Sequence, residues 1–415
     1  MTDRRIRHLV GFFVLSGAVA VGAGASLHGL DNHVGRSTTP TGYVGIVSAD
    51  FEWSDADDEI VGDFGSAGVW AYHNGTWTRL TAMDPEWIFA ARVGASDDEL
   101  VADFGAAGLW VWDYDGWPGT WTQITASNAE GALASDDDGD GTQEFQVDFG
   151  SLGLWRFDWD SRAWTQYTAL NPSGTGLRTD MIGLGQDEGV WAFSGLGVWA
   201  VWWGGSGAYW RQLSPSAPSG NWAAGNFVDP YSGSADATDE LAVEFAGLGT
   251  WLFEDDNDTW TRLTSTPARA LTTTRFGSDS DGELIFATTG GQPWWWGPSW
   301  QQLSGAPMDA GFVRAFDPDG LAEAADEDEL AADFGTLGLW EYNDNLGAGG
   351  TWWQLTSSNP VFLVASDYYG DGAATSLIAW FGPGVGLWLW DSGGGIYPSA
   401  WHKLTDTAPD SFVGW

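Results

Sequence analysis

The sequence contains no cysteine among its 415 residues, and its only lysine is Lys403. The absence of cysteine excludes disulfide bonds, thiolate metal sites and cysteine nucleophiles. Lysine and arginine together number 15 against 57 aspartates and glutamates, so the formal net charge is −42. Such a chain lacks the basic surface that binds nucleic-acid phosphates, and anionic membranes repel it. Two origins would explain a strongly acidic chain with almost no lysine. One is a halophilic host, where salt screens the self-repulsion, and the other is a secreted protein from an organism with a GC-rich, arginine-biased genome.

Long hydrophobic runs are also missing, apart from a short one at Leu9–Val21. Arginines precede this run and Ala23-Gly24-Ala25 follows it, which is the pattern of a cleavable signal peptide over residues 1–25. The alternative is an uncleaved N-terminal anchor. We expect a linker over residues 26–41, one domain over 42–415 and no membrane span after cleavage. The expected location is secreted or extracellular, including the periplasm and the cell surface.

Glycine and tryptophan are abundant, with 59 and 31 copies, and they belong to a repeated motif. The motif reads acid-Leu-x-x-Asp-Phe-Gly-x-x-Gly-Leu-Trp, then a polar turn and Thr-Trp-Thr. Its phenylalanine occurs at Phe64, Phe104, Phe149, Phe193, Phe245, Phe286, Phe334 and Phe381. Its second tryptophan occurs at Trp77, Trp121, Trp164, Trp210, Trp260, Trp300, Trp352 and Trp401. A period of 40–50 residues is typical of propellers and solenoids.

Each copy contains four short segments rich in β-branched and aromatic residues. In the second copy these are 87–93, 100–104, 109–112 and 120–125. Four antiparallel strands repeated eight times predict an all-β fold, a β-propeller of eight four-stranded blades, with a seven-bladed ring as the alternative. The tryptophans are expected to fill the wedges between blades. Residues 43–51 and 411–415 both resemble a first strand, and we expect one of them to close the ring.

An acidic loop in the third copy has the spacing of a calcium site. Oxygen ligands are available from Asp136, Asp138, Asp140, the backbone carbonyl of Thr142, and Glu144. Hard Ca²⁺ prefers several oxygens on one short loop, so we predict a structural calcium ion here, with a solvated acidic turn as the alternative. Copy eight keeps a weaker version at Asp367 and Asp371.

Two further acids recur without a full loop. The glutamate before the second strand persists at Glu59, Glu99, Glu240, Glu283 and Glu329. We expect it to accept hydrogen bonds from the backbone of its own loop. An acid also precedes the phenylalanine at Asp63, Asp103, Asp148, Glu244 and Asp333. Because acids are depleted in strands, we expect it to contact the neighbouring blade or the central channel, or to form a ring for a cation or polar ligand.

These motifs resemble the FG-GAP or VCBS type of repeat, in which an Asp-rich loop precedes a strand that ends in Phe-Gly. The resemblance covers residues 42–415, with the loop at 136–144 and Phe-Gly at 64–65, 104–105, 149–150, 334–335 and 381–382. It implies a β-propeller like the integrin α-subunit head or a fungal N-acetylglucosamine-binding lectin. The single complete loop and the many tryptophans depart from the family pattern.

Consecutive tryptophans are the candidate ligand-binding residues, because neighbours in a strand point to opposite faces and cannot all enter one core. They are Trp202, Trp203, Trp294, Trp295, Trp296, Trp352 and Trp353. We therefore predict a non-catalytic secreted propeller that binds carbohydrate or another extracellular surface. The alternatives are a protein-interaction scaffold and a carboxylate-dependent glycan-active enzyme. No nucleophile elbow, Walker loop or His-Glu-x-x-His motif occurs. The sequence gives no indication of the oligomeric state.

Overall fold

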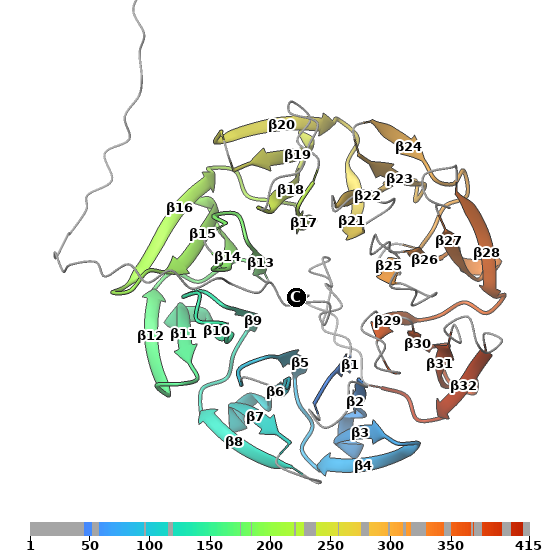
Figure 1. Ribbon diagram of the computed structural model, residues 1–415, viewed down its shortest axis with the longest axis horizontal. Coiled ribbons are helices and arrows are strands. Elements are labelled where there is room, and N and C mark those ends of the chain that lie inside the picture. The colour runs from blue at the N-terminus through green and yellow to red at the C-terminus, as the bar shows by residue number, and fades with distance from the viewer. Residues whose placement is uncertain are drawn as a thin grey trace, which may run out of the picture. The chain divides into compact units, whose positions relative to one another are not determined.

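The computed structural model describes residues 45–51, 58–94, 97–114, 119–174, 176–183, 185–219, 221–227, 238–255, 257–274, 282–297, 299–309, 313–316, 329–343, 350–366, 368, 376–391 and 400–409. These residues form eight antiparallel four-stranded sheets arranged as the blades of a ring (Figure 1). The eight-bladed prediction is confirmed, and the seven-bladed alternative is wrong. The predicted signal peptide lies outside the described residues. Within them, no helix is long and apolar enough to cross a bilayer.

Each blade takes four consecutive strands in chain order. Blade 1 has β1 (Ile46–Ala49), β2 (Glu59–Asp63), β3 (Val69–His73) and β4 (Thr76–Thr81). Blade 2 has β5 (Trp87–Ala91), β6 (Glu99–Asp103), β7 (Leu109–Asp113) and β8 (Thr120–Thr125). Blade 3 has β9 (Gly131–Ser135), β10 (Glu144–Asp148), β11 (Leu154–Asp158) and β12 (Ala163–Thr168). Blade 4 has β13 (Leu177–Thr179), β14 (Glu188–Phe193), β15 (Gly197–Trp203) and β16 (Ala208–Ser214).

The second half of the ring repeats this order. Blade 5 has β17 (Trp222–Gly225), β18 (Glu240–Phe245), β19 (Gly249–Glu254) and β20 (Thr259–Thr264). Blade 6 has β21 (Ala268–Thr274), β22 (Glu283–Thr288), β23 (Pro293–Trp296) and β24 (Trp300–Gln302). Blade 7 has β25 (Val313–Phe316), β26 (Glu329–Asp333), β27 (Leu339–Asn343) and β28 (Thr351–Thr356). Blade 8 has β29 (Phe362–Ser366), β30 (Ser376–Trp380), β31 (Leu387–Asp391) and β32 (Ala400–Thr405).

A tight turn joins the second and third strands of each blade. In four blades it is a 3₁₀ turn: η1 (Gly65–Ala67), η2 (Gly105–Ala107), η3 (Gly150–Leu152) and η4 (Gly335–Leu337). The glycine that ends η3, Gly153, has φ +81°, and a Cβ there would lie 2.1 Å from the carbonyl oxygen of Thr168. Only glycine fits both the backbone angle and the close approach, which explains why the second glycine of the motif recurs.

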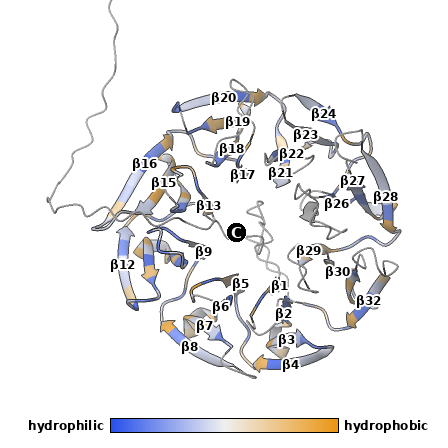
Figure 2. Cartoon of the chain, viewed as in Figure 1, coloured by the Kyte–Doolittle hydropathy of each residue, from blue (hydrophilic) through white to orange (hydrophobic). Residues whose placement is uncertain are grey.

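The core lies in the wedges between blades. Between blades 2 and 3, Val101 and Val111 pack against Phe145 and Phe157, and all four are buried. The strands carry both hydrophobic and hydrophilic segments, as the outer strands β4, β8 and β12 show (Figure 2). Alternating side chains therefore give each sheet an apolar face for its neighbour.

The second tryptophan of the motif is the link between neighbouring blades. Its ring packs edge-to-face on the motif phenylalanine of its own blade in all eight copies, with centroids 4.9–5.9 Å apart. In seven of the eight copies its indole nitrogen donates to a carbonyl in the last strand of the preceding blade or just after it, as from Trp121 to Leu80 at 3.2 Å and Trp164 to Ile124 at 3.1 Å. The expected packing role of these residues is confirmed.

Among the described residues, blades 8 and 1 are joined by the same contact. Trp77 of blade 1 donates to the carbonyl of Leu404 in blade 8 at 3.1 Å. The predicted strand at 43–51 is β1, which pairs within its own blade. The other candidate, 411–415, lies outside the described residues.

Candidate functional site

The acidic loop of blade 3 connects β9 to β10 and is organised by one carboxylate. One oxygen of Asp136 accepts from the backbone nitrogens of Gly139 at 2.8 Å and Asp140 at 3.0 Å, and its other oxygen accepts from Gly141 at 2.9 Å. Both glycines have positive φ, +76° and +92°. The first residue of the predicted calcium motif thus folds the loop into a compact turn.

The structure brings three of the five predicted calcium ligands together. Carboxylate oxygens of Asp136, Asp138 and Glu144 lie within 4.8 Å of one another. Asp140 instead accepts two bonds from Thr142, from its backbone nitrogen at 2.9 Å and its hydroxyl at 2.6 Å. Asp367 and Asp371, the weaker candidates, lie outside the described residues.

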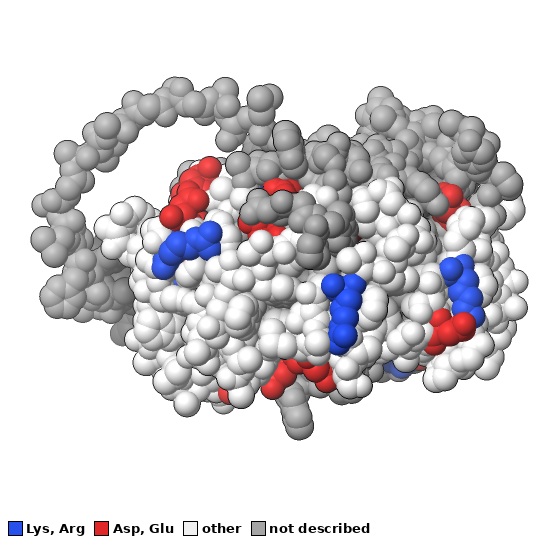
Figure 3. All heavy atoms as spheres, turned by 90° about the horizontal axis from the view of Figure 1, so that it is seen from below, with Lys and Arg blue, Asp and Glu red and all other residues white. Residues whose placement is uncertain are grey.

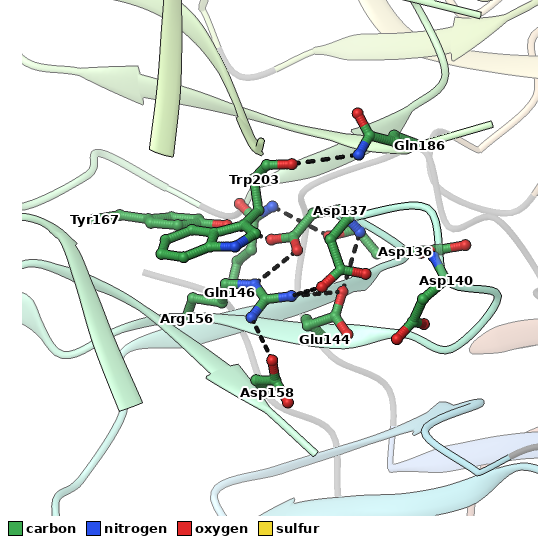
Figure 4. Close-up of polar contacts among 12 residues, drawn as sticks. Asp136, Asp137, Asp140, Glu144, Gln146, Arg156, Asp158, Tyr167, Gln186 and Trp203 are labelled. Carbon is green, nitrogen blue, oxygen red and sulfur yellow. Dashed lines mark hydrogen bonds and ion pairs between the residues drawn. The ribbon is translucent and has the colours of Figure 1, made fainter. Parts of the chain in front are cut away.

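A buried arginine, Arg156 on β11, lies at the centre of this cluster and is 3% exposed (Figure 4). Its guanidinium nitrogens meet four carboxylates from three segments of blade 3. The contacts are Nε to Asp137 at 2.7 Å, Nη2 to Asp138 at 2.6 Å and to Glu144 at 3.2 Å, and Nη1 to Asp158 at 2.8 Å. Charge-assisted bonds of this kind fix the geometry of the loop against the sheet.

The same cluster joins blade 3 to blade 4. Asp137 is fully buried, accepts a hydrogen bond from the hydroxyl of Tyr167, and receives the backbone N–H of Trp203 on its carbonyl at 2.9 Å. The Trp203 ring lies over the Arg156 guanidinium, 5.1 Å from its carbon, and stacks on Tyr167. Trp203, a predicted ligand-binding residue, therefore has a structural role in the wedge between blades.

The cluster holds more negative charge than Arg156 neutralises. Five carboxylates, from Asp136, Asp137, Asp138, Glu144 and Asp158, surround or adjoin one guanidinium. Burial raises the pKa of Glu144, and the charge of Asp137 raises it further. Burial also raises the pKa of Asp136, to about 6. Both shifts arise mainly from burial, and the charges of neighbouring carboxylates add to them.

These residues fit a hard cation. All the available donors are oxygens, and Oδ1 of Asp138 is buried without a hydrogen-bond partner while its Oδ2 contacts Arg156. A calcium ion at this loop would be held by Asp136, Asp138 and Glu144, and it would supply the missing positive charge. Arg156 contacts two of the same carboxylates, so it limits how many of their oxygens remain free for a metal.

Sequence reasoning missed Arg156, although the repeat carries a signal for it. At the equivalent position of the third strand, blade 7 has Glu341, whereas most other blades have apolar residues: Ala71, Val111, Ala200, Leu252 and Leu389. An arginine in that apolar column needs acidic partners inside the wedge. Comparison of the eight copies column by column would have identified it.

The recurring glutamate before the second strand has the expected role. Its side chain accepts the backbone N–H of the preceding loop, with Glu59 bonding Phe51 at 3.0 Å and Glu99 bonding Val93 at 2.9 Å. Glu240 likewise accepts from Phe227, at 2.6 Å. This glutamate therefore persists in blades whose loops have lost the calcium spacing.

The acid before the phenylalanine lies at the opposite end of the second strand. Asp63, Asp148 and Asp333 each accept the backbone N–H two residues later, at 2.8–2.9 Å. Asp103 also accepts from Ala129, which precedes the first strand of the next blade, at 3.3 Å. Asp63, Asp103 and Asp333 are fully buried. The expected contact with the neighbouring blade is therefore found for Asp103.

These buried acids predict a pH-dependent stability. Burial raises the pKa of Asp103, Asp148 and Asp333 from 3.8 to about 7. Between those pH values the folded chain holds more protons than the unfolded chain. The stability that these three groups contribute is therefore fully present below about pH 4 and is lost as the pH rises through 7. We expect a lower melting temperature at pH 8 than at pH 5.

The isosteric change Asp103→Asn tests this cause. The amide cannot ionise and its oxygen can still accept from Ala129, so the variant should lose part of the difference between pH 5 and pH 8 in thermal unfolding. The exposed Asp160→Asn change is the matched control and should keep all of it. An equal pH dependence in both variants would assign the effect to net charge instead.

The other predicted tryptophans divide into packed and exposed residues. Trp296 is buried, Trp294 and Trp295 pack against hydrophobic clusters, and Trp352 is the inter-blade link of blade 7. Trp353 is 61% exposed, and Trp202 stacks on Tyr209, which is 47% exposed. Among the seven predicted tryptophans, Trp353 and the Trp202–Tyr209 stack therefore offer aromatic surface to a ligand.

Comparisons with known proteins give distant structural similarities. No protein family matches this sequence, and no curated protein does. Among solved structures, it is similar to BBS1N in complex with ARL6DN, at 10% identity and a TM-score of 0.45, over 72% of this chain and 91% of that one. It is also similar to the Cps50 (Swd1) β-propeller domain of Myceliophteria thermophila, at 11% identity and a TM-score of 0.40, over 70% of this chain and 92% of that one.

A third similar structure is the GH74 xyloglucanase from Xanthomonas campestris, at 16% identity and a TM-score of 0.44. The match covers 88% of this chain and 55% of the xyloglucanase. Similarities this distant bear on no function. The chain is assigned as a β-propeller by its own eight blades.

Proposed function

We propose that this protein is a secreted, non-catalytic binding propeller that recognises carbohydrate. The observation that carries the proposal is the division of its aromatic residues: one set builds the ring, and another remains exposed on it. Trp353 and Tyr209 present flat apolar surface to solvent on the outer strands β28 and β16. Exposed aromatic faces suit the C–H faces of sugar rings, and exposed apolar surface is typical of binding sites.

The charged residues support a neutral ligand. On the face shown in Figure 3, acidic side chains lie mainly towards the two rims, and isolated basic side chains lie between them. With 57 acids and 15 bases in the chain, an anionic ligand meets repulsion at long range. The recurring acids that the structure describes accept hydrogen bonds within the ring, which favours binding over carboxylate-pair catalysis.

A glycan array tests the proposed function. The purified protein is applied with calcium and with chelator, and we expect a discrete set of neutral glycans to bind. A blank array under both conditions would contradict carbohydrate recognition and favour the protein-interaction scaffold. The resemblance to FG-GAP and VCBS repeats is compatible with either ligand class.

We also propose that a calcium ion stabilises the loop of blade 3 through Asp136, Asp138 and Glu144. Extracellular modules bind calcium at about 0.1–1 mM, and an excess of about a hundredfold over Kd adds about 2.7 kcal/mol to the free energy of unfolding. We therefore expect calcium to raise the melting temperature and chelator to reverse the rise. Chelation without effect on the melting temperature would contradict this site.

Two neighbouring aspartates provide a matched pair of variants. Asp138→Asn removes a charge from the group of three, so the stabilisation by calcium should disappear. Asp140→Asn changes a residue that bonds to Thr142 at the loop tip, so most of the stabilisation should remain. The quantity compared is the increase in melting temperature on adding calcium, because Asp138→Asn also weakens the contact with Arg156. An equal loss in both variants would favour the sequence-based ligand set that includes Asp140.

A further inference from the structure

The first tryptophan of the motif, which we call the hairpin tryptophan in the seven blades considered below, lies at the opposite end of the blade from the acidic loop. The hairpin tryptophans are Trp70, Trp110, Trp155, Trp199, Trp251, Trp340 and Trp388, and all are half-buried. Each is the second or third residue of the third strand and follows a register shift in the pairing with the fourth strand. A β-bulge of this kind redirects the side chain beside it, and the bulge recurs next to the hairpin tryptophan in seven blades.

The polar edge of each hairpin tryptophan is already occupied. Its indole nitrogen donates to the carbonyl three residues earlier, at 2.9–3.3 Å in all seven blades. The turn residue that offers this carbonyl is exposed and apolar in several blades: Leu152 is 56% exposed, Leu196 is 42% and Leu337 is 52%. The surface left to solvent is an indole beside an aliphatic side chain, and both are unusual on an exposed turn.

The residue opposite the hairpin tryptophan divides the blades into two classes. In blades 1, 5 and 8 it is a cation that lies 5.7–5.9 Å from the indole centre: Arg79, Arg262 and Lys403. In blades 2, 3, 4 and 7 it is a glutamine whose side-chain nitrogen donates to the same turn carbonyl, at 2.8–3.0 Å. The cation covers the indole in the first class, whereas the glutamine is held at the turn in the second.

We infer that the hairpin tryptophans of blades 3, 4 and 7, namely Trp155, Trp199 and Trp340, are equivalent subsites for neutral pyranose chains. This inference rests on the proposed function. It places the ligand on the hairpin tryptophans instead of on most of the consecutive tryptophans. A β-1,4-linked chain with equatorial substituents presents flat C–H faces, which complement an indole whose N–H is already bonded. Blades 3 and 4 are neighbours and blade 7 lies across the ring, so the arrangement is multivalent (Figure 1).

The experiment uses cellohexaose and chitohexaose as probes in isothermal titration calorimetry with the full chain. Maltohexaose, whose α-linkages curve the chain, is the control sugar. We expect more than one site per protein and at least a tenfold weaker binding in the triple variant Trp155→Ala, Trp199→Ala and Trp340→Ala. Tenfold corresponds to about 1.4 kcal/mol, the scale of aromatic contacts at an interface.

Two matched variants separate binding from folding. Phenylalanine at the same three positions keeps an aromatic face and loses the indole N–H, so it should restore binding in large part. Alanine in place of the cation-covered Trp70, Trp251 and Trp388 removes the same structural bond and should leave binding unchanged. Equal losses in both alanine triples would overturn the assignment of these subsites.

The outcomes distinguish this inference from the proposed function. If the array identifies glycans and the Trp155, Trp199 and Trp340 triple binds them like the natural chain, the subsite assignment is wrong and carbohydrate recognition stands. If no glycan binds the natural chain in either assay, both are wrong. If Trp353→Ala alone abolishes binding, the ligand lies on the outer strand β28 and not on the hairpins.

Discussion

Replacing Arg156 with methionine is expected to destabilise the protein by about 3–5 kcal/mol, because it leaves buried carboxylates without their counter-charge. Asp137 is fully buried and Glu144 is 3% exposed, and both contact the guanidinium. Methionine fills a similar volume, so lost packing contributes little. Chemical denaturation at pH 7 and constant salt measures the loss.

The double variant Arg156→Met with Asp137→Asn identifies the cause. Removing the buried charge that the arginine balances should recover part of the lost stability, so the two changes should be strongly non-additive. The control is Arg162→Met, an exposed arginine on the Trp159 ring, with an expected effect of about 1 kcal/mol or less. Strictly additive effects of the Arg156 and Asp137 changes would contradict the ion-pair account.

Replacing Trp77 with alanine is expected to cost a similar amount, about 3–5 kcal/mol, because this side chain closes the ring. Its indole donates to Leu404 of blade 8 and packs on Phe64 of its own blade. Thermal unfolding should show a large decrease in melting temperature. Trp77→Phe keeps an aromatic ring between the blades and loses one hydrogen bond. Apart from any difference in packing, it should lower the free energy of unfolding by only about 1 kcal/mol.

A tryptophan in the same blade is the control for this prediction. Trp70 is half-buried and bonds only to its own turn, so Trp70→Ala should destabilise the protein much less than Trp77→Ala. If the two alanine variants are equally stable, ring closure does not depend on the contact between blades 8 and 1.

The sequence was sufficient to predict the architecture because the repeat is so regular. A phenylalanine and a later tryptophan, such as Phe104 and Trp121, follow each other in all eight copies, and their edge-to-face contact recurs around the ring. Periodicity alone therefore indicated four strands per blade and the number of blades. It could not indicate how the ring closes, because residues 43–51 and 411–415 are both strand-like and pairing depends on contacts remote in sequence.

The site was predicted less completely, because its decisive residues come from separate segments. Spacing along the loop grouped Asp136, Asp138 and Glu144, whose carboxylate oxygens lie within 4.8 Å of one another, and their role as calcium ligands stays a prediction. It also assigned Asp140 as a ligand, although local bonds to Thr142 hold that side chain at the loop tip. Arg156 is twelve residues after Glu144 and reaches the loop only through strand pairing.

The tryptophans show the same limit. Adjacent residues such as Trp352 and Trp353 do point to different environments, one between blades and the other into solvent. However, the alternation of side chains along a strand indicates only that adjacent residues point to opposite faces of the sheet. It does not indicate which of the two faces packs against another blade. The hairpin tryptophans meet the packing expectation in part, since Trp199 and Trp340 pack against hydrophobic clusters. The surface that they leave to solvent depends on the bulge and on the short turn beside them.

The most direct test of the central claim is to incubate the purified protein with a glycan that it binds on the array, and to measure both the bound fraction and the intact glycan by mass spectrometry. A non-catalytic binding propeller predicts saturable binding and complete recovery of the intact chain after prolonged incubation. Shorter products that accumulate with time would contradict the account and establish a glycan-active enzyme.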